Sequence, residues 1–403
     1  MKIYIGILYT LITLGDLIFA EGNEKNLKKL ASAHNEFALD LNREFLEIFP
    51  KNVFFSPLGI FSTLSMLYFG SRGNTAEELK GILKYKKTGL ASRSLLQTSR
   101  DFLNKLARAE RERSSNATAL RTANAIVIDK TMNIRSRYKR RIVNGYGTSV
   151  QVVDFSKDAD KAVTEINDWV KKKTNGKITS LVDSLDPSTK MVLLNAVYFK
   201  GLWKFEFDRS KTVKDVFYNL GKESEKREIP FMKITGEFRY GMFANFEALE
   251  LPYKAGNVSM LIVLPNKLDG LQTLIKNITQ NILLNIEDNL AAVNVKVQLP
   301  KFTLNFEIAD LPKRLRKLGV EKIFDSRKAD FSAMILNKGL FVSEIIHKAV
   351  IEVNEEGTEA AGVTGTVVSR SAAEDFKADH PFLFFIKEKS TNWVLFMGSV
   401  ISP

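Results

Sequence analysis

The sequence predicts an α+β protein, and two patterns along the chain support this class. Stretches with helical spacing come mainly early, whereas stretches typical of strands dominate after about residue 176. The chain has 403 residues, of which 45% are hydrophobic and 26% charged, so it can bury a large core. No low-complexity linker or internal repeat marks a domain boundary, although the length alone would favour two or three domains.

The helical stretches are recognised by their apolar spacing and by their end signals. Ser56 and Pro57 form a helix start, because proline fits the first helical position. Asn175 and Gly176 form a helix end, because both residues tolerate the left-handed conformation there. The expected helices are residues 31–49, one starting at Pro57, one starting at Thr75, residues 162–176 and residues 310–320.

The expected strands are apolar or alternate with period two. Residues 191–203 are apolar almost throughout, which is typical of a strand buried on both faces. Residues 246–265 predict a hairpin that turns at residues 255–257. The other expected strands are residues 52–55, residues 119–129, residues 293–307 and two strands within residues 381–401.

The N-terminus has the pattern of a secretory signal peptide. Lys2 precedes an apolar run from residue 4 to residue 14, and Ala20 offers a small residue for cleavage. A membrane anchor is the alternative, but the run is short and Asp16 interrupts its continuation. We therefore expect residues 1–20 to be removed and the protein to be secreted, or stored in a secretory granule, with no transmembrane segment.

Composition narrows the chemistry that the chain can perform. It contains no cysteine and only three histidines, His34, His347 and His380, without metal-ligand spacing, so neither a metal site nor a thiol enzyme is expected. No serine lies in a nucleophile-elbow motif. The net charge of +13 favours binding to polyanions such as glycosaminoglycans. No nucleic-acid motif is present, so that class of partner is set aside. Asn116, Asn257 and Asn277 are candidate glycosylation sites.

A run of small residues near the C-terminus stands between ordinary hydrophobic stretches. Residues 353–371 read VNEEGTEAAGVTGTVVSRS. A flexible linker is one interpretation, but linkers are usually richer in glycine, serine and proline. If Glu359 points to solvent, the opposite set of alternate residues is small or β-branched and uncharged. The segment could therefore serve as a loop in one state and as a buried strand in another.

Seven sequence words, in order, identify the chain as a member of the serpin family by resemblance. They are NVFFSPLGI at 52–60, TNGKI at 174–178, LNAVYFKGLW at 194–203, LPKF at 299–302, ADFS at 329–332, IIHKAVIEVNEEGTEAA at 345–361 and HPFLFFI at 380–386. The resemblance implies the serpin fold, a single domain over residues 21–403. This fold has three β-sheets, eight or nine helices and an exposed reactive-centre loop at about residues 355–379.

The resemblance also implies an activity. A serpin loop is bait for a protease, and after cleavage it inserts into the main sheet with the protease attached. Serpins are a standard example of such loop insertion. We expect the bait bond at Arg370–Ser371, which suits a trypsin-like protease; spacing from the hinge instead selects Ser371–Ala372. The implied hinge comprises Glu355, Glu356, Gly357, Thr358, Glu359, Ala360 and Ala361.

Further residues match family positions of interest. Ser56, Asn195 and His347 correspond to a polar cluster where the main sheet parts, although a static buried network is an equally acceptable interpretation of their residue types. Two basic groups are candidate polyanion sites, and a solvated helix face is the alternative for each. They are Arg108, Arg111 and Arg113, and Arg137, Lys139, Arg140 and Arg141.

Together these observations predict a secreted, monomeric inhibitor that performs no turnover chemistry and needs no cofactor, apart from a sulfated polyanion as an activator. The expected partner is a trypsin-like serine protease, held in a covalent complex, of a clotting or immune cascade. A non-inhibitory serpin with a carrier, storage or chaperone role is the alternative, and charged, bulky or proline residues facing inward in the hinge would favour it.

Overall fold

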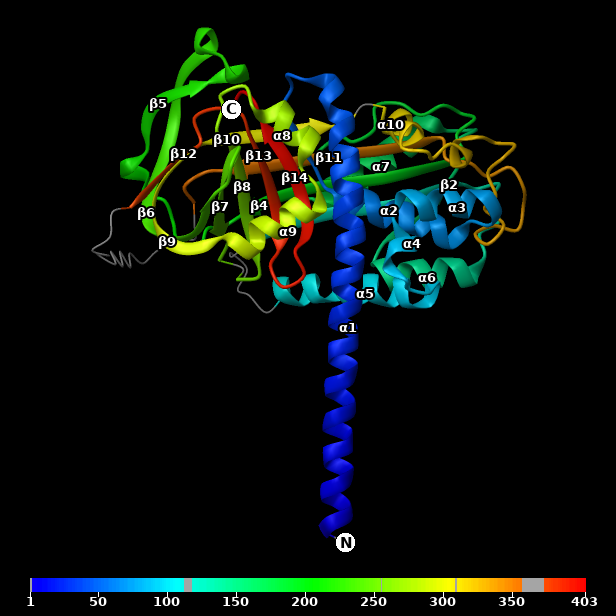
Figure 1. Ribbon diagram of the computed structural model, residues 1–403. Helices are drawn as coiled ribbons and strands as arrows, with labels where there is room; N and C mark the ends of the chain where they lie inside the picture. The colour runs from blue at the N-terminus through cyan, green and yellow to red at the C-terminus, as the bar shows by residue number, and fades with distance from the viewer. Residues whose placement is uncertain (1, 112–117, 255, 309, 357–372) are drawn as a thin grey trace.

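The computed structural model describes residues 2–111, 118–254, 256–308, 310–356 and 373–403. Its strands form two hydrogen-bonded sheets, and helices pack around them (Figure 1). The α-helices of this described part are α1 (Lys2–Glu44), α2 (Pro57–Gly70), α3 (Gly73–Ile82), α4 (Tyr85–Thr88), α5 (Ser92–Arg111), α6 (Ser136–Tyr146), α7 (Ala159–Lys173), α8 (Leu271–Asn277), α9 (Gln280–Asn289) and α10 (Leu311–Lys317).

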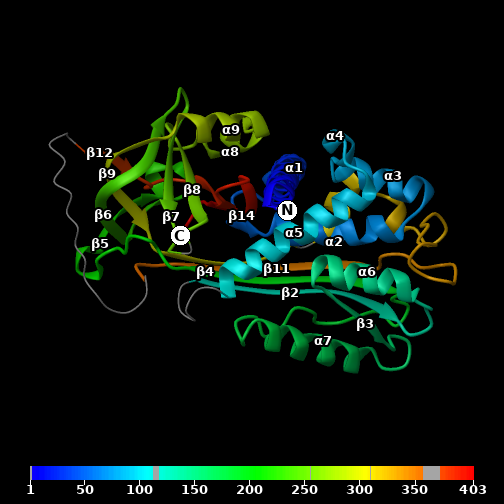
Figure 2. The ribbon, with the colours of Figure 1, turned by 90° about the horizontal axis from the view of Figure 1, so that it is seen from below.

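The smaller sheet has five strands in a mixed arrangement. Their order is β10 (Phe302–Glu307), β11 (Glu344–Val353), β4 (Met191–Gly201), β2 (Thr118–Asp129) and β3 (Ser149–Val153). The central strands β11 and β4 are parallel and pair directly from Glu344 opposite Val192 to Ile351 opposite Phe199. Helices α2 and α7 lie on opposite sides of this sheet (Figure 2). Both faces are therefore covered, which explains why β4 is apolar almost throughout.

The larger sheet has nine strands and joins two regions of the molecule. Its path runs β1 (Val53–Phe55), β14 (Trp393–Val400), β13 (Phe382–Glu388), β8 (Val258–Pro265), β7 (Phe246–Pro252), β6 (Lys226–Met242), β9 (Ala291–Pro300) and β12 (Glu374–Lys377), with β5 (Val213–Tyr218) beside β6. The long strand β6 pairs with β9 along most of its length and with β7 only near its end. The family resemblance implied three sheets, and the length of β6 explains why the described strands connect into two.

Several local predictions are confirmed. The Ser56 side chain accepts a hydrogen bond from the Gly59 amide at 3.1 Å, and α2 begins at Pro57. The predicted hairpin is the β7–β8 pair. The predicted strand stretch of residues 293–307 is divided between β9 and β10. The chain leaves the larger sheet after Pro300 and enters the smaller one at Phe302, and sequence alternation cannot show that consecutive strands belong to different sheets.

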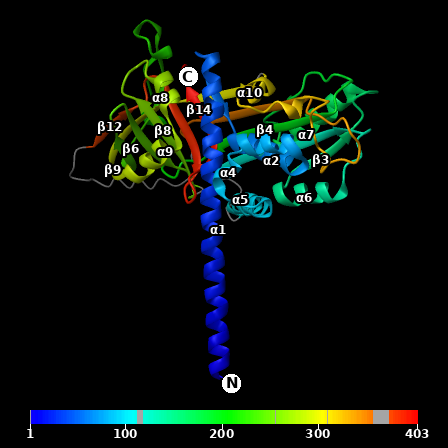
Figure 3. The ribbon, with the colours of Figure 1, turned by 45° about the vertical axis from the view of Figure 1, so that its right-hand side comes forward.

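Helix α1 extends from the predicted leader into the domain without interruption. Its side chains are described from Gly22 onward, and those on its apolar face are buried in the core from Leu27. The helix lies beside β14 (Figure 3). There the buried Asn35 side chain donates to the Asn392 carbonyl at 2.7 Å and accepts from the Val394 amide at 3.0 Å. Within the described residues, no helix combines the length and the apolar character that crossing a membrane requires.

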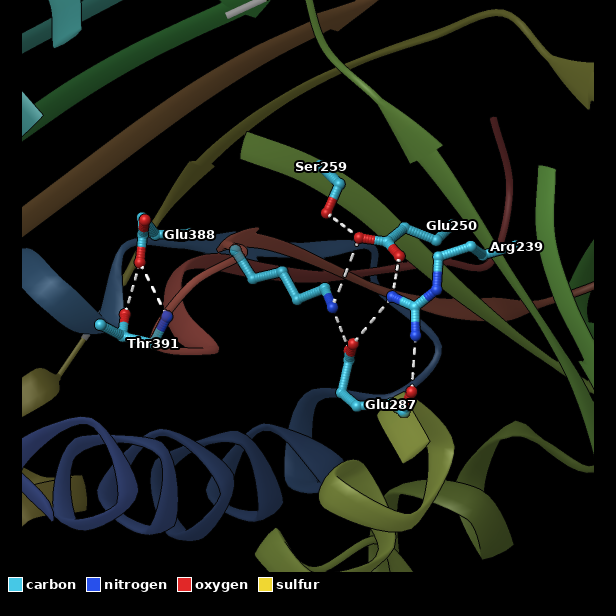
Figure 4. Close-up of polar contacts among 7 residues, drawn as sticks. Arg239, Glu250, Ser259, Glu287, Glu388 and Thr391 are labelled. Carbon is cyan, nitrogen blue, oxygen red and sulfur yellow. Dashed lines mark hydrogen bonds and ion pairs between the residues drawn. The ribbon is translucent and has the colours of Figure 1, made fainter. Parts of the chain in front are cut away.

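A buried cluster of charges ties the larger sheet to α9 (Figure 4). Lys387 on β13 forms ion pairs with Glu287 on α9 and with Glu250 on β7, and its side chain is only 4% exposed. Arg239 on β6 contacts the same two carboxylates, at 2.5 Å from Glu250 and 3.4 Å from Glu287. Ser259 on β8 donates to Glu250 at 2.6 Å. Burial alone would raise the pKa of Glu250, but Lys387 and Ser259 outweigh burial and lower it.

Replacing Lys387 by methionine should destabilise the protein by about 3–5 kcal/mol, because Glu250 and Glu287 would keep only Arg239 between them. The double variant Lys387→Met, Glu250→Met should regain most of that loss, since Arg239 would then face Glu287 alone. Thermal and urea unfolding measure both variants, with Ser259→Ala as the control that removes one hydrogen bond. A single variant as stable as the unchanged protein would contradict this account of the cluster.

Candidate functional site

Three polar residues that the sequence predicted to act together lie close together, two on central strands of the smaller sheet and one at the start of α2. Ser56 precedes α2, His347 lies on β11, and Asn195 lies opposite His347 in the β11–β4 register. The Ser56 amide donates to His347 Nε2 at 3.1 Å, and the Ser56 hydroxyl donates to the Leu395 carbonyl at 3.0 Å. All three residues are buried. We call Ser56, Asn195 and His347 the sheet-opening cluster.

The sheet-opening cluster contains hydrogen-bonding capacity that is not used within the described residues. His347 Nε2 accepts a hydrogen bond, so the neutral ring carries its proton on Nδ1, and that atom is buried without a described partner. Asn195 donates to the Asn124 side chain, but its Oδ1 is likewise buried without a described partner. An unsatisfied donor and an unsatisfied acceptor thus lie on paired residues of β11 and β4. Each unmet group costs roughly 1–3 kcal/mol.

Burial fixes the protonation state of the histidine. It lowers the pKa of His347 to about 3, because the buried ring loses the solvent that would stabilise its charged form. The ring is therefore neutral at physiological pH. Gly59 on α2 allows the close approach of the helix to the cluster, since a Cβ at this position would overlap the Asn195 side chain. The cluster is consequently neutral and tightly packed.

The hinge begins at the end of β11, and its first glutamate is anchored. Glu355 is 6% exposed; its carboxylate forms an ion pair with Lys301 at 2.8 Å and accepts from the Thr212 hydroxyl at 2.7 Å. Burial would raise the pKa of Glu355, but these two hydrogen bonds outweigh it and leave the pKa below the ordinary value of 4.5. Next to it, the Trp203 indole donates to the Asn354 carbonyl at 2.9 Å.

The second hinge glutamate is held from another side. Glu356 contacts Lys200 on β4 at 2.5 Å and Arg209 at 2.7 Å. The hydrogen bond from Lys200 is the largest influence on the Glu356 carboxylate and lowers its pKa. We call the contacts of Glu355 and Glu356 with Lys301, Thr212, Lys200 and Arg209 the hinge anchors. They fix the point at which the chain leaves the smaller sheet.

The remaining loop predictions fall mainly outside the described residues. Residues 357–372 contain Gly357, Thr358, Glu359, Ala360 and Ala361 of the hinge and the bait bond Arg370–Ser371, and all of these lie outside the described part. The chain is described again from Ala373. Residues 374–377 then form β12, parallel to β9, so the predicted loop of about residues 355–379 ends in a short strand.

The structure describes the second basic group more fully than the first. In the first, Arg108 is exposed on α5, the side chain of Arg111 is not described, and Arg113 lies in the undescribed segment 112–117. The second lies on α6, with Arg137, Lys139 and Arg140 exposed.

Arg141 differs from the other basic residues of α6. Its guanidinium lies over the Phe69 ring, 4.7 Å from the centroid, and burial lowers its pKa. The helix confirms that Arg137, Arg140 and Arg141 share a face, of which Arg141 is partly engaged in packing.

Two of the three glycosylation sequons can be located. Asn257 is exposed between β7 and β8, as predicted for a hairpin tip, and Asn277 is exposed at the end of α8. The Thr279 side chain of the second sequon caps α9 by accepting from the Ile282 amide at 3.3 Å. Asn116 lies outside the described residues.

Sequence reasoning missed the partners of the hinge glutamates and of Asn195. Lys200, Arg209, Thr212 and Lys301 come from three separate stretches, and no spacing rule connects them with Glu355 and Glu356. The sequence contains one weak signal for the partner of Asn195, because Asn124 is a polar residue in the middle of a predicted strand. Such a residue in a buried strand usually has a buried partner.

Comparison with known proteins places this geometry among well-described relatives. The family model described as "Serpin (serine protease inhibitor)" matches residues 32–403. Iripin-1 from Ixodes ricinus is 37% identical over 406 residues, covering all of both chains. Leukocyte elastase inhibitor A from Mus musculus is 37% identical over 389 residues, covering 94% of this chain and all of its own. The crystal structure of native protease nexin-1 with heparin superimposes with a TM-score of 0.82 at 30% identity, covering 94% of this chain and all of that one.

The hinge anchors should make the stability of the protein depend on acid. Both folded-state pKa values are depressed, so the anchors stabilise the native state above the ordinary glutamate pKa of 4.5, and this contribution is lost as the pH falls through the lower folded values. The variant Glu355→Gln, Glu356→Gln should be less stable at pH 7 by roughly 1.5–3 kcal/mol, the range for hydrogen bonds to charged groups.

Between pH 6 and pH 3 the double variant should also lose less stability than the unchanged protein. Thermal unfolding measured across this range compares the two curves, and their difference removes the effect of the other carboxylates. Curves that run parallel at every pH would show that the hinge anchors carry no acid dependence.

Proposed function

Because the chain belongs to the serpin family, we propose that it inhibits a serine protease as a suicide substrate and performs no turnover chemistry. The protease cleaves the loop after the hinge, and the loop then enters the smaller sheet between β4 and β11. The attached protease is carried along and trapped before the acyl bond is hydrolysed.

The direct parallel pairing of β4 with β11 is the observation that carries this proposal. A segment that turns back after Glu356 would run antiparallel to β11, and therefore also antiparallel to β4. Insertion would replace one parallel ladder by two antiparallel ladders, which are slightly more stable per residue. In this proposal a sixth strand therefore has a reason to enter, and the five described strands form the sheet that it would enter.

The sheet-opening cluster supports the same proposal. Parting β4 from β11 would separate His347 from Asn195 and give their unpaired Nδ1 and Oδ1 atoms access to new partners. Among the described residues these two groups have no hydrogen-bond partner, whereas an inserted strand could supply one. A purely static network, the other interpretation of these residues, gives no reason for two such groups on paired strands.

The bait bond in this proposal is Arg370–Ser371, with a trypsin-like protease as target. Arg370 is the only charged residue from residue 360 to residue 373, and a carboxylate-lined specificity pocket would select it. The name of the relative leukocyte elastase inhibitor A favours a small-residue pocket instead, and cleavage at Ser371–Ala372 would suit that pocket. We propose an extracellular clotting or immune cascade as the setting.

The proposal also includes a secreted monomer without residues 1–20. Iripin-1 aligns with all of this chain, and leukocyte elastase inhibitor A aligns with 94% of it. The family model begins at residue 32. A non-inhibitory role is the alternative function, but Thr358, Ala360 and Gly362, which belong to the inward set of the loop, are small and uncharged, and this favours insertion.

Incubation with trypsin, thrombin-like and elastase-like proteases should give a covalent complex that survives denaturing electrophoresis with at least one trypsin-like enzyme. Arg370→Ala should abolish that complex, because the arginine side chain no longer fills the pocket. Mass spectrometry of the released C-terminal peptide identifies the bond, and a fragment that begins at Ser371 is expected. A fragment that begins at Ala372, with complexes only for elastase-like enzymes, would overturn the arginine assignment.

Thr358→Arg should convert the inhibitor into a substrate. Thr358 belongs to the inward set, so its replacement would bury an unpaired charge at a cost of several kcal/mol and slow insertion. The matched control is Glu359→Arg, which changes the neighbouring outward position and should leave complex formation nearly unchanged. The rate of complex formation is measured by gel densitometry of samples stopped at successive times. Equal rates for the two variants would falsify insertion with Thr358 facing inward and Glu359 facing outward.

A sulfated polyanion is proposed to bind α6 and to accelerate inhibition, and the heparin named with protease nexin-1 supports this class of ligand. Charge reversal at Arg137 and Arg140, both exposed, should shorten retention on a heparin column and lower its salt dependence. Reversal of the exposed Lys171 and Lys172 on α7 removes the same charge and is the control. Equal retention of the two variants would mean that α6 has no special role.

A further inference from the structure

The segment that follows α7 contacts both central strands of the smaller sheet. We call residues 174–182 the strap. The Lys177 ammonium on the strap lies 3.6 Å from the Glu352 carboxylate on β11 and 5.0 Å from the centroid of the Tyr198 ring on β4. The strap therefore reaches across the contact between β4 and β11, on the face of the sheet that α7 covers (Figure 2).

The strap is tied to α7 and to β11 by further hydrogen bonds. The Asn167 side chain on α7 accepts from the amides of Leu181 and Val182, at 2.8 Å and 3.0 Å. The Ser180 carbonyl accepts from the Lys348 side chain on β11 at 3.1 Å. A movement of β11 away from β4 would therefore act on the strap and, through the strap, on α7.

A side-chain hydrogen bond joins β4 to β11 directly under Lys177. The Tyr198 hydroxyl donates to the Glu352 carboxylate at 3.1 Å, and Tyr198 is only 2% exposed. Tyr198 lies opposite Val350 in the register, so the bond runs diagonally from one strand to the other. Hydrogen bonds to an ionised acceptor are roughly twice as strong as those between neutral groups. We call Tyr198, Glu352 and Lys177 the strand bridge.

Each residue of the strand bridge contacts the other two. Lys177 places its positive charge against both the Glu352 carboxylate and the face of the Tyr198 ring. Burial and, after it, the charge of Glu352 raise the pKa of Tyr198, so the hydroxyl keeps its proton and remains the donor at neutral pH. Loss of any one member would therefore weaken the contacts of the remaining pair.

The strand bridge lies near the point where the chain leaves β11. Glu352 is on β11 shortly before the anchored Glu355, whereas the pair of His347 and Asn195 lies further along the sheet. Neighbouring strands are about 4.8 Å apart, so a strand entering between β4 and β11 would place them about 9.6 Å apart. Tyr198 would then lose its present contact with Glu352. Entry from the hinge end would have to break the strand bridge before it reached the sheet-opening cluster.

We propose that Tyr198 is a positioning residue for insertion: with Glu352 and Lys177 it holds β4 against β11, and its release sets the rate at which a sixth strand enters. This role rests on the proposed function, because insertion is the step that breaks the bridge. It differs from the role of the sheet-opening cluster, whose groups gain partners on entry, whereas Tyr198 loses the partner that it has.

The test uses a synthetic peptide with the sequence of residues 357–370, so that no protease is needed. Its uptake by the full chain is followed over time on native gels. Tyr198→Phe removes only the hydroxyl and should raise the rate of uptake by a factor of about three or more, because the bond is absent once the strands have parted. The matched control is Tyr240→Phe, which removes a hydroxyl that donates to Glu247 at 2.7 Å between β6 and β7 of the larger sheet.

Both variants lose a hydrogen bond between a tyrosine and a glutamate, so a general loss of stability would accelerate uptake equally in both. Equal rates for Tyr198→Phe and Tyr240→Phe therefore overturn the proposal. The second readout is the limiting rate of covalent complex formation at saturating inhibitor, which Tyr198→Phe should raise without changing the half-saturating concentration. If no variant takes up the peptide and no protease forms a complex, the proposed function is overturned, and this role falls with it.

A second variant tests the part of the strap. Lys177 is exposed, so Lys177→Met removes the charge and keeps the length of the side chain without disturbing the core. It should speed peptide uptake, and combination with Tyr198→Phe should speed uptake by less than the product of the two separate factors, since both act on Glu352. An unchanged rate for Lys177→Met, or factors that multiply, overturns the assignment of Lys177 to the strand bridge.

Discussion

Strands β4 and β11 run parallel through the centre of the smaller sheet, and the rest of the site is arranged around their contact. The sheet-opening cluster lies at the contact, with a donor on His347 and an acceptor on Asn195 that have no partner among the described residues. The hinge anchors lie at its end, where β11 becomes the loop. Helix α7 covers the face opposite α2 with a small apolar core of its own. Each of these features would have to yield or re-form for one more strand to enter.

The energetic character of β11 differs between its centre and its end. At its centre the polar groups are neutral and buried, and two of them have no hydrogen-bond partner in the part of the chain that the structure describes. At its end Glu355 and Glu356 are ionised and fully engaged, so the hinge is fixed by charge. A native state of this kind is held by its anchors as well as by its packing. Its lifetime would then depend on the barrier to rearrangement more than on the depth of its energy minimum.

Local sequence signals predicted the local structure well. Ser56 and Pro57 specify the start of α2, the apolar run of β4 specifies a doubly covered strand, and the turn at residues 255–257 specifies the β7–β8 hairpin. Long-range relations were not predictable. The break between β9 and β10, the partners of the hinge glutamates and the buried cluster around Lys387 each join residues that no periodicity connects. The loop could be predicted only through its small residues and the family resemblance.

The burial of His347 has a consequence for where the protein can be kept. Histidine is the side chain that usually senses mild acid, yet the pKa of this one is about 3, so acidification to pH 5 leaves the centre of the sheet chemically unchanged. The hinge carboxylates also stay ionised at pH 5, since their pKa values are below the ordinary one. Mild acid would therefore leave the sheet-opening histidine and the hinge anchors in the same charge state as neutral solution does.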